Sequence, residues 1–244
     1  MKIFPAIDLY EGKAVRLLKG KYEDMTVYSE DPPQIGRDFA AQGAEYIHIV
    51  DLQGARDGNT PNFETVCRIK EASGLFCEIG GGIRSMDVVD KYIGAGLDRV
   101  ILGTAAVTDE AFAKAAVEKY GEKIAIGIDL KDGYVAIKGW TEKSRETAAG
   151  FCAKMRDMGV KTIIVTDISK DGAMKGTNHR LYEELAADFD MQIVASGGVS
   201  SMDAVKRLAA QDLYGAIIGK AYYTGDIDLR EAIEAAAGAA EEDR

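Results

Sequence analysis

The sequence has few of the residues that build metal sites, disulfide frameworks and flexible linkers. It contains two histidines, three cysteines and four prolines among 244 residues. Cys67, Cys77 and Cys152 lie far apart and form no C-x-x-C pair, which argues against both a disulfide framework and a zinc site. Two histidines are too few for a His-rich metal cluster or a credible Ser-His-Asp triad. We therefore expect no metal centre and no nucleophilic serine of that kind.

Long apolar runs, targeting segments and an excess of positive charge are also lacking. No apolar stretch approaches the about 20 residues that a membrane span needs, and the N-terminus does not resemble a signal peptide. The formal net charge of −10 argues against a nucleic-acid-binding surface and against binding to an anionic membrane. The cysteines fall in apolar patterns, which favours the reducing cytoplasm. We expect a cytoplasmic protein that binds neither nucleic acid nor membrane.

Hydrophobic residues make up 47% of the chain, enough for one large core, and no low-complexity stretch divides residues 1–244 into several domains.

Short, β-branched apolar runs alternate with longer amphipathic stretches, the pattern of parallel strands and helices. The predicted strands are Lys2–Ile7, Tyr46–Val50, Leu75–Ile79, Arg99–Leu102, Lys123–Ile128, Lys161–Thr166, Met191–Ala195 and Tyr214–Ile218. The predicted helices are Pro33–Gln42, Asn62–Ala72, Ser85–Ile93, Asp109–Lys119, Ser144–Met158, Asn178–Ala187, Ser200–Ala209 and Asp228–Ala237. Several of these begin with a residue that favours the helix N-cap, namely Asn62, Ser85, Ser144, Asn178 and Ser200. Strict alternation of eight strands and eight helices predicts an α/β fold, either a (β/α)8 TIM barrel or a doubly wound open sheet.

The two halves of the chain resemble each other. Glu78-Ile-Gly-Gly-Gly-Ile-Arg-Ser-Met-Asp87 matches Val194-Ala-Ser-Gly-Gly-Val-Ser-Ser-Met-Asp203 at a shift of 116 residues. The same shift relates Asp51 to Asp167, and a shift of 121 relates Ala6-Ile-Asp-Leu9 to Gly127-Ile-Asp-Leu130. This register indicates two half-barrels, at about 1–122 and 123–244, each of four strand–helix units. A repeat of four units closes into eight, which favours the barrel over the open sheet.

Four glycine turns follow predicted strands, in two pairs related by the repeat. Backbone amides can approach an anion closely at glycine, and a helix N-terminus adds a favourable dipole. The loops after the seventh and eighth strands are a recurrent phosphate site in this fold, so the repeat predicts a second phosphate site opposite. We expect Arg84 to reinforce the site after the third and fourth strands, and Lys220 the site after the seventh and eighth. The alternative is that these glycines only form tight turns. The turn residues are Gly81, Gly82, Gly103, Thr104, Gly197, Gly198, Gly219 and Lys220.

Two aspartates, Asp8 and Asp129, end the first and fifth predicted strands, which face each other in an eight-stranded barrel. Such a pair can act as general acid and general base on the middle of a ligand that carries a phosphate at each end. The alternative is that each aspartate only caps a loop or pairs with a neighbouring lysine. Asp51 and Asp167 also end strands, and we leave open whether they position neighbours or take part in catalysis.

The loops that follow these strands hold further candidate ligand contacts. Thr166 and Asp171 could contact the ligand or order their loop, and Gly172 and Gly176 would let that loop act as a lid. Trp140, the single tryptophan, lies in a polar excursion, where we expect it to stack on a heterocycle rather than join the core. The excursions at 10–31 and 131–143 could both fold over the site.

These motifs together resemble the isomerase family of histidine biosynthesis, which acts on phosphoribosylformimino-aminoimidazole carboxamide ribotide. The resemblance implies an Amadori rearrangement of an aminoaldose to an aminoketose, on a substrate with two phosphates and without metal or cofactor. It implies Asp8 as the base that moves the C2 proton, Asp129 as the acid that opens the ribose ring, and Thr166 as an orienting group. It rests on Pro5-Ala-Ile-Asp-Leu9, Gly12-Lys-Ala-Val-Arg-Leu17, Thr26-Val-Tyr28, Val50-Asp-Leu52, Gly80-Gly-Gly-Ile-Arg-Ser85, Gly139-Trp140, Thr166-Asp-Ile168 and Asp171-Gly172.

Related activities remain as alternatives. The cyclase subunit of imidazole glycerol phosphate synthase shares the half-barrel symmetry and both aspartates, and another relative also isomerises phosphoribosylanthranilate. A phospholigand-binding barrel without catalysis is a third alternative, against which both aspartates argue. Lys21 and Gln53 stand where the family often has acidic residues, which affects the expected contacts of two loops. We expect a monomer, since the pattern leaves no strand edge or large apolar stripe unpaired.

Overall fold

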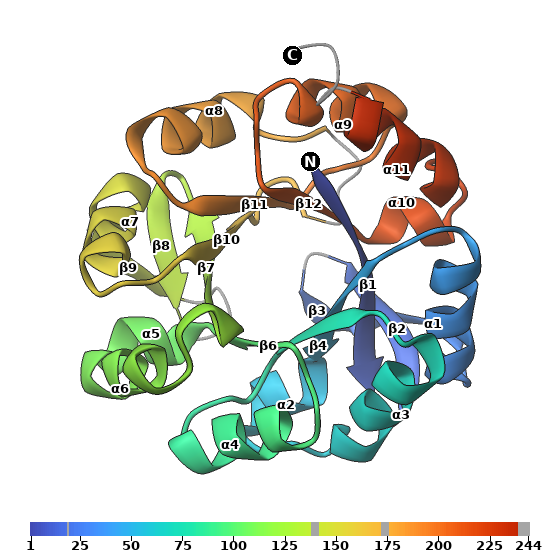
Figure 1. Ribbon diagram of the computed structural model, residues 1–244, viewed down its shortest axis with the longest axis horizontal. Coiled ribbons are helices and arrows are strands. Elements are labelled where there is room, and N and C mark those ends of the chain that lie inside the picture. The colour runs from blue at the N-terminus through green and yellow to red at the C-terminus, as the bar shows by residue number, and fades with distance from the viewer. Residues whose placement is uncertain (19, 138–141, 172–175, 239–244) are drawn as a thin grey trace.

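A closed ring of eight parallel strands forms the centre of the molecule, and the helices lie outside it (Figure 1). The computed structural model describes residues 1–18, 20–137, 142–171 and 176–238. Each strand of the ring pairs in parallel with the next, and the last pairs with the first. The ring strands are β1 (Lys2–Tyr10), β4 (Tyr46–Asp51), β5 (Phe76–Gly80), β6 (Arg99–Leu102), β7 (Ile124–Lys131), β10 (Thr162–Asp167), β11 (Gln192–Ser196) and β12 (Gly215–Ile218). The prediction of a (β/α)8 TIM barrel is confirmed, and the open sheet is wrong.

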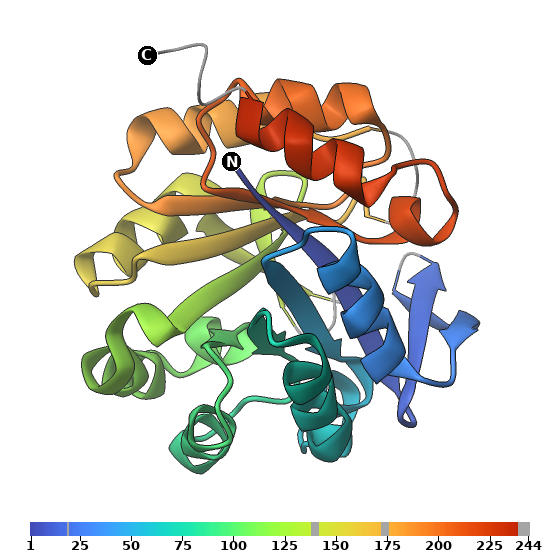
Figure 2. The same cartoon turned by 45° about the vertical axis from the view of Figure 1, so that its right-hand side comes forward.

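Eight helices of at least eight residues cover the outside of the ring within the described chain (Figures 1 and 2). They are α1 (Pro32–Ala41), α3 (Phe63–Ser73), α4 (Met86–Gly94), α6 (Glu110–Tyr120), α7 (Ala148–Asp157), α8 (His179–Asp188), α9 (Met202–Ala209) and α11 (Leu229–Gly238). Three short helices and a 3-10 turn lie in the loops: α2 (Leu52–Asp57), α5 (Thr104–Thr108), α10 (Lys220–Tyr223) and η1 (Gly121–Lys123). None of the described helices has both the length and the apolar character of a membrane span.

The predicted helix starts are partly correct. Ser85 and Asn178 cap α4 and α8 as predicted, each accepting a bond from a first-turn amide. Ser144 is wrong as a cap, because the chain there still pairs in a β-hairpin, and Thr147 caps α7 instead. The cap of α9 is Ser201, one residue later than predicted.

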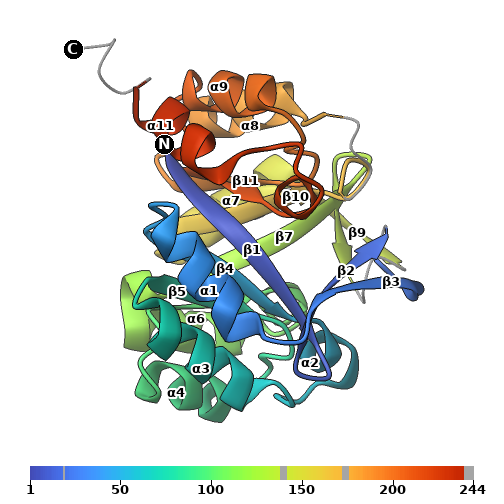
Figure 3. The same ribbon diagram turned by 90° about the vertical axis from the view of Figure 1, so that its right-hand side faces the viewer.

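The two excursions form antiparallel hairpins, which the apolar pattern did not predict. After β1 the chain forms β2 (Lys13–Leu18) and β3 (Lys21–Ser29), and after β7 it forms β8 (Tyr134–Ile137) and β9 (Glu142–Thr147). Figure 3 shows β2, β3 and β9 projecting from one end of the barrel, the end at which the ring strands finish. Each hairpin thus extends a ring strand past the rim.

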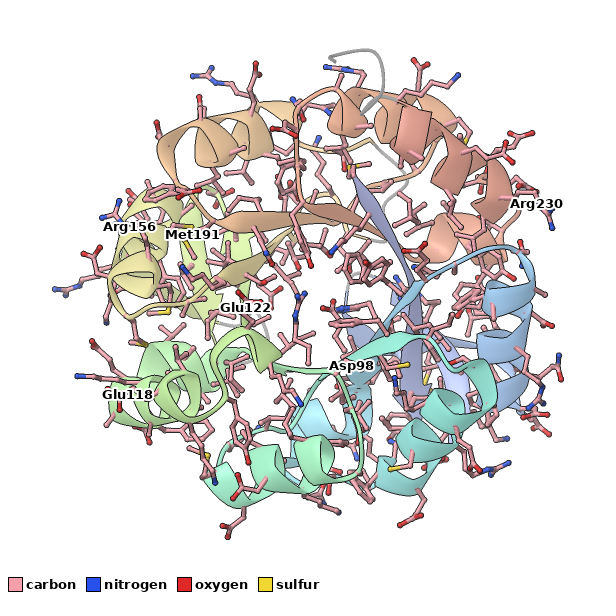
Figure 4. The ribbon with its side chains drawn as sticks, in the orientation of Figure 1. Asp98, Glu118, Glu122, Arg156, Met191 and Arg230 are labelled. Atoms are coloured by element: carbon pink, nitrogen blue, oxygen red, sulfur yellow. The ribbon has the colours of Figure 1, made fainter. Side chains whose placement is uncertain are left out.

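The ring strands separate two apolar layers. Alternate residues point to opposite faces of a strand, so Ile47 and Ile49 pack outward against helices while Phe4 and Ala6 fill the interior. On the helices, charged residues such as Glu118, Arg156 and Arg230 point away from the barrel (Figure 4). The interior cluster is completed by Ile101, Ala125, Ile164, Val194 and Ile217. These interior side chains fill the middle of the barrel. The carboxyl ends of the strands lie beyond them and can form a site.

Candidate active site at the carboxyl ends of the strands

The three predicted catalytic residues share the inward face of the barrel at one end. Asp8 is two residues beyond the interior Ala6 on β1, and strand alternation therefore turns it inward. Asp129 and Thr166 follow Ala125 and Ile164 by even numbers of residues, and they are direct register partners across β7 and β10. Since β1 and β7 are four strands apart in the ring, Asp8 and Asp129 face the mouth from opposite walls.

The Asp8 carboxylate is paired with a guanidinium that sequence reasoning did not identify. Arg16 Nη1 lies 2.7 Å from Asp8 Oδ2, and the side chains are only 13% and 14% exposed. Burial raises the pKa of Asp8 above its ordinary value, although the Arg16 charge acts to lower it, and Asp171 adds to the rise. Asp8 is therefore a carboxyl whose basicity depends on the charges around it.

Hairpin geometry explains how Arg16 reaches the site. The pairing of β2 with β1 sets Asp8 opposite Val15 and so brings the next residue, Arg16, near, and the 2.7 Å contact shows that its side chain turns to the carboxylate. Burial acts to lower the pKa of Arg16, but the carboxylates of Asp8 and Asp171 more than offset this and raise it. The available signal was a charged residue inside the apolar run Ala14-Val-Arg-Leu-Leu18.

The glycine turns have a steric cause that does not depend on a ligand. Gly81 and Gly197 have φ of +99° and +86°, and a Cβ on Gly81 would overlap the carbonyl oxygen of Asp51. A Cβ on Gly197 would lie 2.7 Å from the carbonyl oxygen of Asp167, the position related by the repeat. The tight-turn explanation therefore has direct support at Gly81-Gly82 and Gly197-Gly198, and phosphate binding there stays a prediction.

The other two turns differ from these. Gly103 and Gly219 are the N-caps of α5 and α10 and share a backbone conformation, with φ, ψ of −95°, −115° and −104°, −106°. Neither short helix has a side-chain cap among the described residues, so their first-turn amides are not covered by a capping group. Apart from its neighbours in the chain, no described residue lies within 4 Å of the Cβ position of Gly103, whereas Arg16 lies against Gly219.

The remaining predicted contacts are placed as follows. Arg84 Nη2 donates to the carbonyl of Ala55, 3.0 Å away, so the guanidinium lies against the loop of α2. Lys220 and Thr104 begin α10 and α5. Asp171 is half-buried, and the carbonyl of Gly176 lies against Gly198. Trp140 and Gly172 lie outside the described residues.

Asp51 and Asp167, whose role was left open, each accept a set of hydrogen bonds that holds a loop in place, and we call each set a latch. The Asp51 carboxylate is fully buried and accepts bonds from the Gly54 amide and from the backbone and side-chain nitrogens of Asn62, at 2.7–3.2 Å. Asp167 accepts from the Ser169 amide and hydroxyl and from Asn178 Nδ2 at 2.8 Å. Each bond set ties the loop after a strand to the next helix. Asn62, predicted as a cap, makes no capping bond, and its side-chain oxygen accepts instead from the Gly12 amide at 2.7 Å.

Replacement of Asn62 by alanine tests the Asp51 latch. We expect the free energy of unfolding to fall by about 1–3 kcal/mol, because the buried Asp51 carboxylate loses its side-chain donor and the Gly12 amide loses its acceptor. Denaturant unfolding measures it. Asn59→Ala in the same loop, where the side chain is exposed, is the matched control and should change stability by less than about 0.5 kcal/mol. Equal effects of the two substitutions would contradict the latch.

Among the described residues, no three His, Cys, Asp or Glu side chains come together as metal ligands would. This arrangement suits proton transfer on a substrate that carries anionic groups. The two carboxyls could move protons, and the guanidinium and the uncapped amides could bind the anionic groups of the substrate.

Comparison with known proteins gives a consistent relationship over nearly the whole chain. A family of proteins described as histidine biosynthesis proteins matches residues 2–228. A relative from Oceanobacillus iheyensis is 48% identical over 234 residues, covering 96% of this chain and 98% of its own. Relatives from Brachyspira hyodysenteriae (46% identical, covering 97% and 99%) and Lactococcus lactis subsp. cremoris (47%, covering 95% and 95%) are similarly close. All three are named 1-(5-phosphoribosyl)-5-((5-phosphoribosylamino)methylideneamino)imidazole-4-carboxamide isomerase.

Proposed function

Because the chain belongs to the family of histidine biosynthesis proteins, we propose that it is the aldose–ketose isomerase that its relatives are named for. The substrate would be the bisphosphorylated aminoaldose ribotide, and the product its aminoketose. The observation that carries the proposal is the pair of inward carboxyls on facing strands, Asp8 and Asp129, in a chain that aligns with these isomerases over nearly its full length.

The proposed reaction is an Amadori rearrangement by acid–base catalysis. Asp129 donates a proton to the ribose ring oxygen as the bond from C1 to that oxygen breaks, which leaves a protonated imine. Asp8 then removes the C2 proton to give an enolamine. The proton held by Asp8 is returned at C1 while the C2 hydroxyl gives up its proton to Asp129, which yields the ketose and restores both carboxyls. Thr166, the register partner of Asp129, orients the reacting groups. Each positioned proton transfer is typically worth about 10²–10⁴-fold in rate.

The two phosphates of the substrate would bind at opposite walls of the mouth. One lies at the turns after β5 and β6, with Arg84, and the other at the turns after β11 and β12, with Lys220. Gly172, Gly176 and Trp140 would take part in covering the substrate. The long substrate then crosses the mouth with its sugar between Asp8 and Asp129.

The organisation of the chain is also a proposal. We infer one domain over residues 1–244, built from half-barrels at about 1–122 and 123–244, and a cytoplasmic monomer. The two latches support the repeat, because Asp51 with Asn62 and Asp167 with Asn178 lie at matching positions 116 residues apart.

Turnover of the purified protein tests the function. The aminoaldose ribotide is supplied without added metal, coupled to a known cyclase, and followed spectrophotometrically, with phosphoribosylanthranilate in parallel. Conversion of the first substrate alone supports the dedicated isomerase, and conversion of both indicates a dual-pathway enzyme. Conversion of neither would contradict the proposal and favour the cyclase or a binding protein.

A comparison of Asp129→Asn with Asp171→Asn tests which carboxyl is the acid. We expect Asp129→Asn to lower kcat by at least about 10²-fold, in the range of general acid catalysis, and Asp171→Asn to lower it by less than about tenfold. Asp171 is the chosen comparison because its charge acts on both Asp8 and Arg16. A larger loss in Asp171→Asn would transfer the role of acid to that residue.

A further inference from the structure

The Arg16 guanidinium lies between two parts of the site that the proposed reaction uses separately. On one side Nη1 donates to Asp8 Oδ2 at 2.7 Å. On the other side the guanidinium packs against Gly219, where its Cζ would be 2.8 Å from a Cβ at that position. Gly219 is the N-cap of α10 and belongs to the phosphate site predicted after β11 and β12. One cation thus touches the proposed base and the proposed phosphate loop.

Aromatic contacts hold the hairpin that carries Arg16 against the barrel. Tyr28 on β3 packs on Tyr223 of α10 with ring centroids 4.8 Å apart. The Tyr223 hydroxyl in turn donates to the carbonyl of Ala6 on β1, at 2.8 Å. The hairpin, the predicted phosphate loop and the strand of the proposed base are therefore packed together around Arg16.

The chemistry of arginine suits two anionic partners at once. A guanidinium has five donors in a planar fork, and it forms bidentate bonds with carboxylates and phosphates alike. One edge of Arg16 is used by Asp8, and the rest of the group faces the Gly219 turn. Apart from its chain neighbours, none of the described residues lies within 4 Å of the Cβ position of Gly103 at the related turn, so among them a guanidinium packs against the Gly219 turn and not against its counterpart.

We propose that Arg16 is a positioning residue through which a phosphate monoester bound at Gly219 and Lys220 controls the charge environment of the Asp8 carboxylate. A phosphate at this turn competes with Asp8 for the same guanidinium. As the donors turn to the phosphate, Asp8 loses part of its compensating charge and becomes a stronger base. The base is thus strengthened when the phosphate end of the substrate is seated. This inference rests on the proposed function, which names Asp8 as the base and assigns a substrate phosphate to the Gly219 turn.

A double-mutant cycle on phosphate binding tests the coupling without any turnover. Inorganic phosphate is titrated by ³¹P NMR into the intact protein and into Asp8→Asn, Arg16→Met and the double variant, with a two-site analysis. We expect Asp8→Asn to tighten one site by at least about fivefold, the lower end of typical couplings between sites, because Arg16 is released to the phosphate. In the Arg16→Met background the same change should alter affinity by less than about twofold.

Two outcomes would overturn the proposal. If Asp8→Asn tightens binding equally in both backgrounds, the cause is the lost negative charge and not a shared guanidinium. If Asp8→Asn changes neither site, phosphate and carboxylate do not compete. Lys13→Met on the same strand is the matched control, because Lys13 forms an exposed ion pair with Glu30 and should leave phosphate affinity and the unfolding midpoint unchanged.

A kinetic readout separates this role from a merely structural one. Removing Arg16 removes an influence that lowers the pKa of Asp8, so the acid limb of kcat/KM should move to higher pH in Arg16→Met. Arg16→Lys keeps the charge but not the fork, and should return the limb toward its original position. A raised KM with an unmoved limb would show that Arg16 only binds substrate, and would contradict the coupling.

Discussion

Replacement of Asp8 by asparagine is expected to lower kcat by about 10²–10⁴-fold, the contribution of a positioned general base. The amide has nearly the shape of the carboxyl but cannot accept the C2 proton. KM should change by less than about tenfold, because the interaction with the base is made in the transition state and most binding energy comes from the phosphates. Steady-state turnover of the aminoaldose ribotide measures both constants.

The matched control for this substitution is Glu30→Gln, which removes a carboxylate from the exposed ion pair of the same hairpin. It should retain full activity. Full activity in Asp8→Asn would remove Asp8 from the mechanism, whereas equal losses in both variants would point to a general effect of negative charge.

The pH dependence of the intact protein follows from the same residue. A base must be ionised to accept a proton, so kcat/KM falls as pH drops through the pKa of Asp8. Burial raises that pKa above its ordinary value of 3.8, and the fall should therefore begin at a higher pH than for an exposed aspartate. The acid limb should disappear in Asp8→Asn.

Replacement of Gly81 by alanine is expected to cause the largest loss of stability among single substitutions in the turns. The residue has φ of +99°, and an added Cβ would overlap the backbone of Asp51. Left-handed strain and overpacking together should reduce the free energy of unfolding by about 2–5 kcal/mol. Urea unfolding followed by circular dichroism measures the change.

Gly43→Ala provides the comparison, since Gly43 has a similar φ of +91° but, apart from its chain neighbours, no described residue lies within 4 Å of its Cβ position. It carries the strain without the overlap, and should cost only about 1–2 kcal/mol. If the two variants lose equal stability, the close approach to Asp51 is not what requires glycine at position 81.

The barrel itself could be predicted because its strands are buried on both faces. Strands buried on both faces consist of continuous apolar runs, which are visible in the sequence. Each predicted strand accordingly overlaps an observed one. The hairpins were not predicted, because only one strand of each, β2 or β8, holds a short apolar run, and its partner, β3 or β9, is largely polar. Ser144 shows the consequence: a good cap residue was assigned to a helix while the chain there belongs to β9.

The placement of the candidate residues could be predicted where it depends on the strands. Asp8 and Asp129 were expected to face each other because they end opposite strands, whereas Thr166 received its proposed role from the resemblance, and the roles of all three stay a proposal. Arg16 could not be placed, because its position depends on how β2 pairs with β1. The role of Asp51 also required the structure, since its partner Asn62 lies in another element and the sequence does not show which atoms meet.

The two hairpins have free strand edges, which closure of the ring removes from the barrel itself. A closed barrel has no free strand edge, yet among the described residues β3 pairs only with β2, and β9 only with β8. Open edges invite strands from a second copy, and charges on such strands discourage this pairing. Glu23 and Asp24 on β3 and Arg145 on β9 are exposed. Extending the rim with hairpins thus creates edges at which a second copy could pair, and these exposed charges discourage that pairing.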